Sequence, residues 1–156
     1  MNTVFNAALK YLSAKNLTES ELRVRLENEF ASLADVDEQV NNALKRLNEL
    51  HLINDSFIAN SQAERYQHKG NRFIKQRLKQ KGVDEQSIEQ ALDALPDEHE
   101  RAFEAARRKW RSLNNETKQA KDNKLLRFLS GRGFSSAVCY QVLEEMEDEY
   151  QSYESP

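Results

Sequence analysis

Residues 78–83 read LKQKGV, and residues 129–134, at an offset of 51 positions, read LSGRGF. In both stretches a leucine is followed four residues later by a glycine and then by an apolar residue, the pattern of a helix that ends at a left-handed glycine. A second helix is predicted to follow each glycine, with equivalent apolar positions at Ile88 and Cys139. Cys139 is therefore interpreted as a small buried apolar residue in preference to a reactive thiol. The chain contains an internal helical repeat.

The same helical periodicity extends toward the N-terminus. Residues 18–21, TESE, form a capping box that predicts a helix start, because the threonine hydroxyl and the glutamate carboxylate can each accept a backbone N–H. Residues 36–44, VDEQVNNAL, are echoed by residues 83–92, VDEQSIEQAL, with one extra residue. We therefore predict an all-α chain of three tandem three-helix repeats. The expected boundaries are 1–53, 54–95 and 96–149, followed by an acidic C-terminal tail at 150–156.

The composition favours an elongated helical array. Of the 156 residues, 38% are hydrophobic and 31% are charged, which favours a shape with much surface per residue. Four glycines and two prolines are too few for the turns of a β-sandwich or barrel of this size. The sequence shows neither an apolar run long enough to span a membrane nor the pattern of a signal peptide. Because a single cysteine cannot form an internal disulfide, we expect a cytoplasmic protein. We also expect a monomer.

The residue types that carry enzyme chemistry are absent or scattered. The four glycines form neither a Walker motif nor GxGxxG, and the three histidines stand singly, away from the one cysteine. Carboxylate pairs such as Glu144 and Glu145 lie in polar runs, without the apolar surroundings of a catalytic carboxyl group. We therefore predict a protein without catalytic activity, cofactor or metal ion.

Charge is strongly segregated along the chain. Residues 65–81 contain seven basic residues and no acid, and residues 107–132 contain nine basic residues and two acids. Between these blocks, residues 84–100 contain seven acids and no base. Helical geometry places Arg72, Lys75 and Lys79 within a stripe about 60° wide, opposite the apolar side of the same helix. Such a stripe is either a solvated helix face without a binding role or a surface that binds phosphates or an acidic protein. The complete absence of acids from residues 65–81 favours a binding role.

The aromatic residues of the basic blocks are interpreted as core. Phe73, Trp110 and Phe128 recur at the spacing of a buried helix face, which favours packing over a role as exposed platforms for stacked bases. The residues alone therefore indicate a charged helical binding array, and they do not identify its partner.

Three segments in register with the repeat resemble the RecX family of bacterial recombinase regulators. They are SELRVRL at 20–26, LINDSFIA at 52–59 together with Lys81-Gly82-Val83, and KLLRFLSGRGF at 124–134. The resemblance covers about residues 7–147. It implies a curved, elongated molecule of three tandem three-helix units, and a non-enzymatic activity. The implied partner is the RecA–single-stranded DNA filament, whose extension would be limited, so that RecA strand exchange, ATP hydrolysis and coprotease action would be inhibited.

The resemblance and the charge pattern together give the candidate residues for filament or DNA binding. Those at the positions of the family's basic surface are Lys69, Arg72, Lys75, Lys79, Lys81, Lys124, Arg127 and Arg132, and the second basic block adds Arg107, Arg108 and Arg111. Two alternatives stay open. One is a stand-alone basic-striped helical protein that competes for single-stranded DNA, and the other is a helical-repeat adaptor that contacts no DNA.

Overall fold

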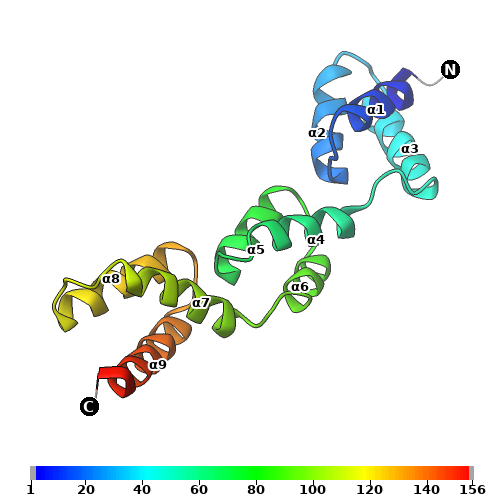
Figure 1. Ribbon diagram of the computed structural model, residues 1–156. Coiled ribbons are helices and arrows are strands. Elements are labelled where there is room, and N and C mark those ends of the chain that lie inside the picture. Colours follow the sequence, from blue (N-terminus) through cyan, green and yellow to red (C-terminus); the bar gives the residue numbers. More distant parts are fainter. Residues whose placement is uncertain (1–2, 155–156) are drawn as a thin grey trace. The chain divides into compact units, whose positions relative to one another are not determined.

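The computed structural model describes residues 3–154, with side chains described for residues 3–149. Within these residues the chain is entirely helical, without a strand (Figure 1). The helices are α1 (Thr3–Ala14), α2 (Glu19–Glu29), α3 (Val36–Glu49), α4 (Asp55–Arg65), α5 (Asn71–Gln80), α6 (Glu85–Asp93), α7 (Glu98–Arg111), α8 (Lys118–Gly131) and α9 (Ser136–Glu154). The predicted all-α fold is confirmed. None of the helices in the described part is both long enough and apolar enough to cross a membrane.

The helix start predicted at Thr18 is formed by the expected side chains. The Thr18 hydroxyl accepts the Glu21 N–H at 3.2 Å, and the Glu21 carboxylate accepts the Thr18 N–H at 3.1 Å, so the capping box is present. At the start of α4, the Asn54 side-chain oxygen accepts the Phe57 N–H at 3.0 Å. Asp35 occupies the N-cap position of α3 but makes no capping bond, because its carboxylate accepts hydrogen bonds from the Gln39 side chain instead.

The two copies of the repeated leucine–glycine motif, residues 78–83 and 129–134, adopt the same turn. Gly82 and Gly133 have φ angles of 82° and 93°, a conformation that glycine adopts without the steric cost of a side chain. The Val83 N–H bonds to the Leu78 carbonyl at 3.0 Å, and the Phe134 N–H bonds to the Leu129 carbonyl at 3.2 Å. These bonds satisfy carbonyls at the helix end, as the repeat predicted.

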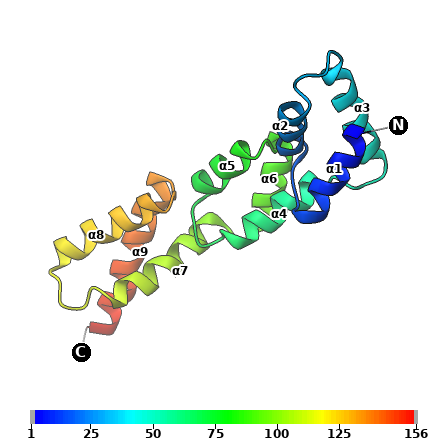
Figure 2. The ribbon, with the colours of Figure 1, turned by 90° about the horizontal axis from the view of Figure 1, so that it is seen from above.

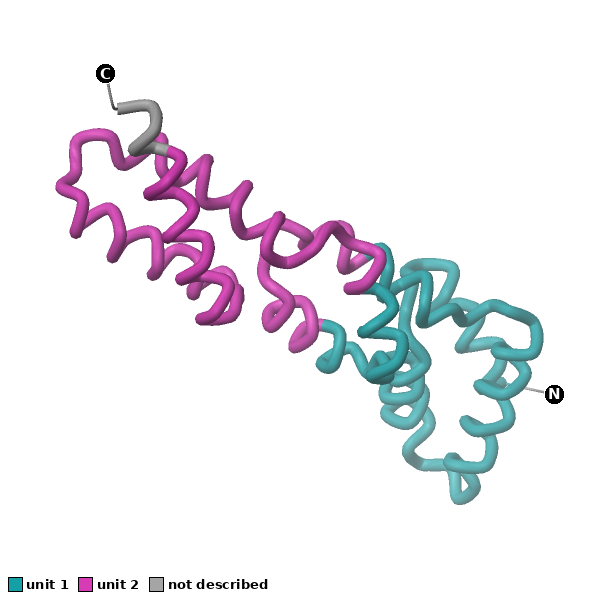
Figure 3. Tube along the Cα trace, turned by 90° about the horizontal axis from the view of Figure 1, so that it is seen from below, with its two compact units in different colours: residues 1–61, 78–91 teal, residues 62–77, 92–156 magenta. Residues whose placement is uncertain are grey.

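The chain divides into two compact units (Figure 3). Unit 1 contains the residues up to 61 together with 78–91, and unit 2 contains 62–77 together with the residues from 92 onward. Each of the helices α4, α5 and α6 has residues in both units. Each predicted repeat contains three helices, and the predicted boundaries between the repeats stay a prediction.

Unit 1 has its core among α1, α2 and α3. The core consists mainly of aliphatic side chains at helical spacing, among them Val4, Ala8, Leu22, Leu26, Val40, Leu44 and Leu47. On α4 the aromatic Phe57 is 57% exposed, whereas the next two residues, Ile58 and Ala59, are buried, so the inward face of this helix begins at Ile58.

Unit 2 has its core among α7, α8 and α9, which pack against one another (Figure 2). The core contains Ala102, Ala106, Trp110, Leu125, Leu129, Phe134, Cys139, Val142 and Met146. Cys139 is 3% exposed, and burial raises the pKa of its thiol, which confirms its interpretation as an apolar core residue. Helix α9 continues past the predicted boundary at 149 as far as Glu154, and the side chains of the predicted acidic tail lie outside the described residues.

Candidate binding surface

The first turn of α5 meets the last turn of α8 within unit 2. The Gly70 N–H donates to the Arg132 carbonyl at 2.8 Å, and the backbone of Gly133 lies directly against Gly70. The guanidinium of Arg72 donates to the Ser130 carbonyl at 3.0 Å. The contact between two glycines allows these backbones to approach closely, and it brings basic residues of both predicted basic blocks to one junction.

A buried arginine holds the segment before α5 in place. Arg101 of α7 is 7% exposed, and its guanidinium donates to the carbonyls of Pro96 (2.8 Å), Gln67 (3.1 Å) and Lys69 (2.7 Å), and to the Asn71 side chain. Burial lowers the pKa of Arg101, and the nearby Glu98 and Asp97 oppose that shift. Arg101 therefore positions the backbone that carries Lys69. This role could not be predicted from the sequence, because Arg101 follows the acidic stretch and stands outside both basic blocks.

Replacing Arg101 by lysine should destabilise unit 2 by about 2 kcal/mol, although the charge is kept. A lysine ammonium lacks the planar fork of donors that reaches four acceptors at once, so buried carbonyls lose their partners. Chemical denaturation of the full chain measures the change. Arg111→Lys is the matched control: Arg111 is exposed, so its change should stay within about 0.5 kcal/mol. An unchanged denaturation midpoint for Arg101→Lys would contradict this role.

The structure separates the candidate cations into two groups. The first group pairs with carboxylates of the chain itself, which offsets the charge available to a partner. The pairs are Lys81–Glu21 (3.4 Å), Arg107–Glu149 (3.8 Å), Arg108–Glu104 (3.6 Å) and Lys124–Glu116. These residues are weaker candidates for binding an anionic partner than their basic character suggests.

The second group makes no ion pair with a described carboxylate. Three of its members touch the fold in other ways: Arg72 through Ser130, Lys69 over the Phe73 ring at 5.1 Å, and Arg132 over the Phe128 ring at 4.5 Å. The other members are Lys75, Lys79, Arg111 and Arg127, all exposed. The predicted exposure of the α5 stripe is thus confirmed.

Lys69, Arg72, Lys75, Arg127 and Arg132 are called the junction surface below; all five belong to unit 2. The contacts of Gly70 with Arg132 and of Arg72 with Ser130 bring Lys69 and Arg72 close to Arg132, while Lys75 and Arg127 lie farther along α5 and α8. The positive charge of this surface acts on the neighbouring His68. Burial lowers the pKa of His68, and the charges of Arg132 and Lys69 lower it further. The arrangement can attract anions through several cations at once.

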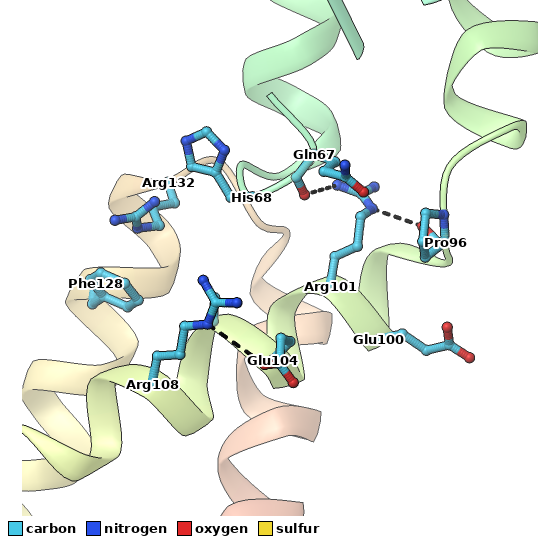
Figure 4. Close-up of a pocket in the computed structure, with 10 residues that line it drawn as sticks. Gln67, His68, Pro96, Glu100, Arg101, Glu104, Arg108, Phe128 and Arg132 are labelled. Atoms are coloured by element: carbon cyan, nitrogen blue, oxygen red, sulfur yellow. Dashed lines mark hydrogen bonds and ion pairs between the residues drawn. The ribbon is translucent and has the colours of Figure 1, made fainter. Parts of the chain in front are cut away.

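The aromatic residues near this surface differ in exposure. Trp110 is buried, as predicted, whereas Phe73 and Phe128 are half-buried and lie beneath basic side chains. Phe128 also borders a cavity of about 660 Å³ in unit 2, whose lining residues are shown in Figure 4. Among the described side chains, no three His, Cys, Asp or Glu residues group in a way that could hold a metal ion.

Comparison with known proteins identifies the family. Two family models match, "RecX, third three-helix domain" over residues 97–143 and "RecX, second three-helix domain" over residues 61–92. A regulatory protein RecX from Leptothrix cholodnii is 33% identical over 146 residues, which cover 92% of this chain and 88% of that protein. The chain belongs to the RecX family. It therefore has the helical-repeat fold of that family, as the resemblance implied.

Other RecX proteins are similar over most of this chain. The regulatory protein RecX from Deinococcus radiodurans is 29% identical over 141 residues, covering 89% of this chain and 66% of that protein. The crystal structure of RecX from Lactobacillus salivarius matches with a TM-score of 0.78 and 28% identity, covering 92% of this chain and 94% of that one. The chain spans 54% of the RecX protein from Limosilactobacillus reuteri, so some relatives are considerably longer.

Proposed function

We propose that this RecX-family chain is a regulatory protein that binds the RecA–single-stranded DNA filament and limits its extension. RecA recombinase, ATPase and coprotease activities would be inhibited as a consequence. The observation that carries the proposal is the junction surface in a chain that belongs to the RecX family. Its five cations have no carboxylate partner among the described residues, so their charge remains available to phosphates or to acidic groups of a recombinase.

The expected binding is electrostatic and distributed over several contacts. Cations that contact phosphates release counterions, so affinity should fall steeply as the salt concentration rises. The α5 stripe also includes Lys79, which belongs to unit 1. Several linked weak contacts give a combined affinity greater than any one of them, which suits a long repetitive partner such as a nucleoprotein filament.

The competing function is simple coating of single-stranded DNA, which the same basic surface would support. The two functions differ in stoichiometry. A protein that limits filament extension acts at the growing end or at a few sites, whereas a competitor for DNA must occupy most of the lattice.

The single-stranded-DNA-dependent ATPase of RecA separates these functions when the chain is titrated upward from well below the RecA concentration. We expect inhibition at a small fraction of the RecA concentration, and a weaker effect at high salt. The same titration is repeated at two DNA concentrations. Inhibition that begins only near saturation of the DNA, and shifts in proportion to the DNA added, would support coating and contradict our proposal.

A further inference from the structure

The cavity of unit 2 lies beside the junction surface and shares Arg132 with it. Its volume of about 660 Å³ is within the range of small-molecule sites, about 300–1,000 Å³. Its lining comes from the segment between α4 and α5, from α7 and from α8. Figure 4 shows Phe128 and Arg132 on one side of the cavity and Pro96 and Glu100 on the opposite side, with Arg108 between them.

One side of this cavity combines cations with an aromatic ring. The Arg132 guanidinium lies 4.5 Å from the centre of the Phe128 ring, and the Lys109 ammonium lies 5.4 Å from it. Arg108 reaches toward the same side, and because its 3.6 Å ion pair to Glu104 is largely exposed and therefore weak, a phosphate can compete for it. An aromatic ring with guanidinium groups around it offers a stacking surface and phosphate donors together.

The other side offers hydrogen-bond acceptors. Glu100 of α7 lines it, together with Gln67. Arg101 also contributes to the lining, but four of the five N–H groups of its guanidinium are already bonded to the chain. Arg101 therefore shapes the wall of the cavity, while Glu100 provides acceptors for groups that carry N–H bonds.

A nucleotide matches both sides of the cavity. Its phosphate is an anion, its base has a planar π-face, and the exocyclic or ring N–H groups of the base are donors. We propose that this cavity is a subsite for one nucleotide of single-stranded DNA, with its base against Phe128 and its phosphate at Arg108 and Arg132. The subsite rests on the proposed function in taking the single strand as its ligand, and neighbouring phosphates would continue along Lys69 and Arg72 of the junction surface.

An acidic peptide fits the cavity less well. Its carboxylates could pair with Arg108 and Arg132, but they supply no planar ring to pack against Phe128. A strand of phosphates without bases would use the cations alone and gain nothing from Phe128. The base is therefore the part of the ligand that the cavity selects, and the experiment must measure its contribution.

The experiment measures fluorescence anisotropy of the full chain with a labelled oligothymidylate, without RecA, and with the same oligonucleotide made abasic. The two probes have equal numbers of phosphates, so their difference reports the base. We expect the wild-type chain to bind the thymidylate about tenfold more tightly than the abasic strand. Phe128→Leu should remove this preference by weakening thymidylate binding about tenfold, while Phe128→Trp restores it.

Phe103→Leu is the matched control. Phe103 is also half-buried and also lies under an arginine, Arg107, at 5.9 Å, but it does not line the cavity. We expect this variant to keep the preference for the thymidylate strand. Arg132→Gln should reduce the dependence of log affinity on log salt by about one phosphate contact, whereas Phe128→Leu should leave that dependence unchanged.

Three outcomes would overturn the subsite. They are equal affinity of the wild-type chain for the two strands, equal losses in Phe128→Leu and Phe103→Leu, and no binding to either strand. Equal affinity would indicate that the surface binds phosphates only. The outcome is separable from the proposed function: a chain that prefers thymidylate through Phe128 yet never inhibits RecA would keep the subsite and lose the regulatory role. A chain that inhibits RecA but binds DNA without a contribution from Phe128 would keep the regulatory role and lose the subsite.

Discussion

Reversing the three charges of the α5 stripe, with Arg72, Lys75 and Lys79 all replaced by glutamate, should abolish inhibition of the RecA filament while the chain stays folded. All three side chains are exposed, and among the described residues Arg72 alone of the three forms a side-chain hydrogen bond, to the Ser130 carbonyl. The apolar residues Ile74 and Leu78 on the opposite side of α5 are untouched and remain buried. The stability of the fold should therefore change little. A partner that carries phosphates, in contrast, meets three repulsive charges in place of three attractive ones.

The control for this variant must change the net charge by the same amount elsewhere. Lys10, Lys15 and Lys45 are exposed lysines of unit 1, outside the junction surface and without ion pairs among the described residues. Replacing these three by glutamate should leave most of the inhibition in place. Circular dichroism establishes that both triple variants are helical, and the RecA ATPase measures their effect. Full inhibition by the folded α5 variant would remove the stripe from the mechanism, and equal losses in both variants would indicate a general charge effect.

The local features of this chain could be predicted from the sequence because they depend on residues close together along it. The capping box at Thr18 and the helix ends at Gly82 and Gly133 depend on contacts within five residues. The exposure of the α5 stripe depends on the helical period and on the apolar residues that alternate with it. The internal repeat strengthened these predictions, since the same pattern occurred twice at equivalent positions.

The features that depend on contacts between distant residues could not be predicted. Lys81 and Glu21 are 60 positions apart, and nothing in the charge pattern indicated that this pair would reduce the value of Lys81 as a candidate. Arg101 stands outside both basic blocks in the sequence, yet it is buried and bonded to backbone carbonyls more than thirty positions away. Composition locates basic and acidic segments, whereas the choice of partners is made by the packing of helices, which periodicity alone does not specify.

Replacing Gly70 by alanine should destabilise unit 2 by about 3 kcal/mol, the largest effect expected of any single methyl group in this region. An added Cβ would lie 2.1 Å from the carbonyl carbon and oxygen of Gly133, and 2.2 Å from the Phe134 nitrogen. These are backbone atoms, so no side chain can rotate away to make room. The helix ends must separate, and the 2.8 Å bond from the Gly70 N–H to the Arg132 carbonyl is lost with the contact.

Gly131→Ala is the matched control, because it adds the same methyl group to the other side of the turn. No atom lies within 4 Å of the added Cβ, and Gly131 lies in α8, where alanine is favoured by about 0.5 kcal/mol or more. The thermal unfolding temperature should therefore fall for Gly70→Ala and rise for Gly131→Ala, by about 2–4 °C per kcal/mol. A Gly70→Ala chain as stable as the wild type would show that α5 and α8 do not need this approach. Because that contact holds Lys69 and Arg72 close to Arg132, Gly70→Ala should also weaken RecA inhibition at temperatures where the chain remains folded, while Gly131→Ala should leave it intact.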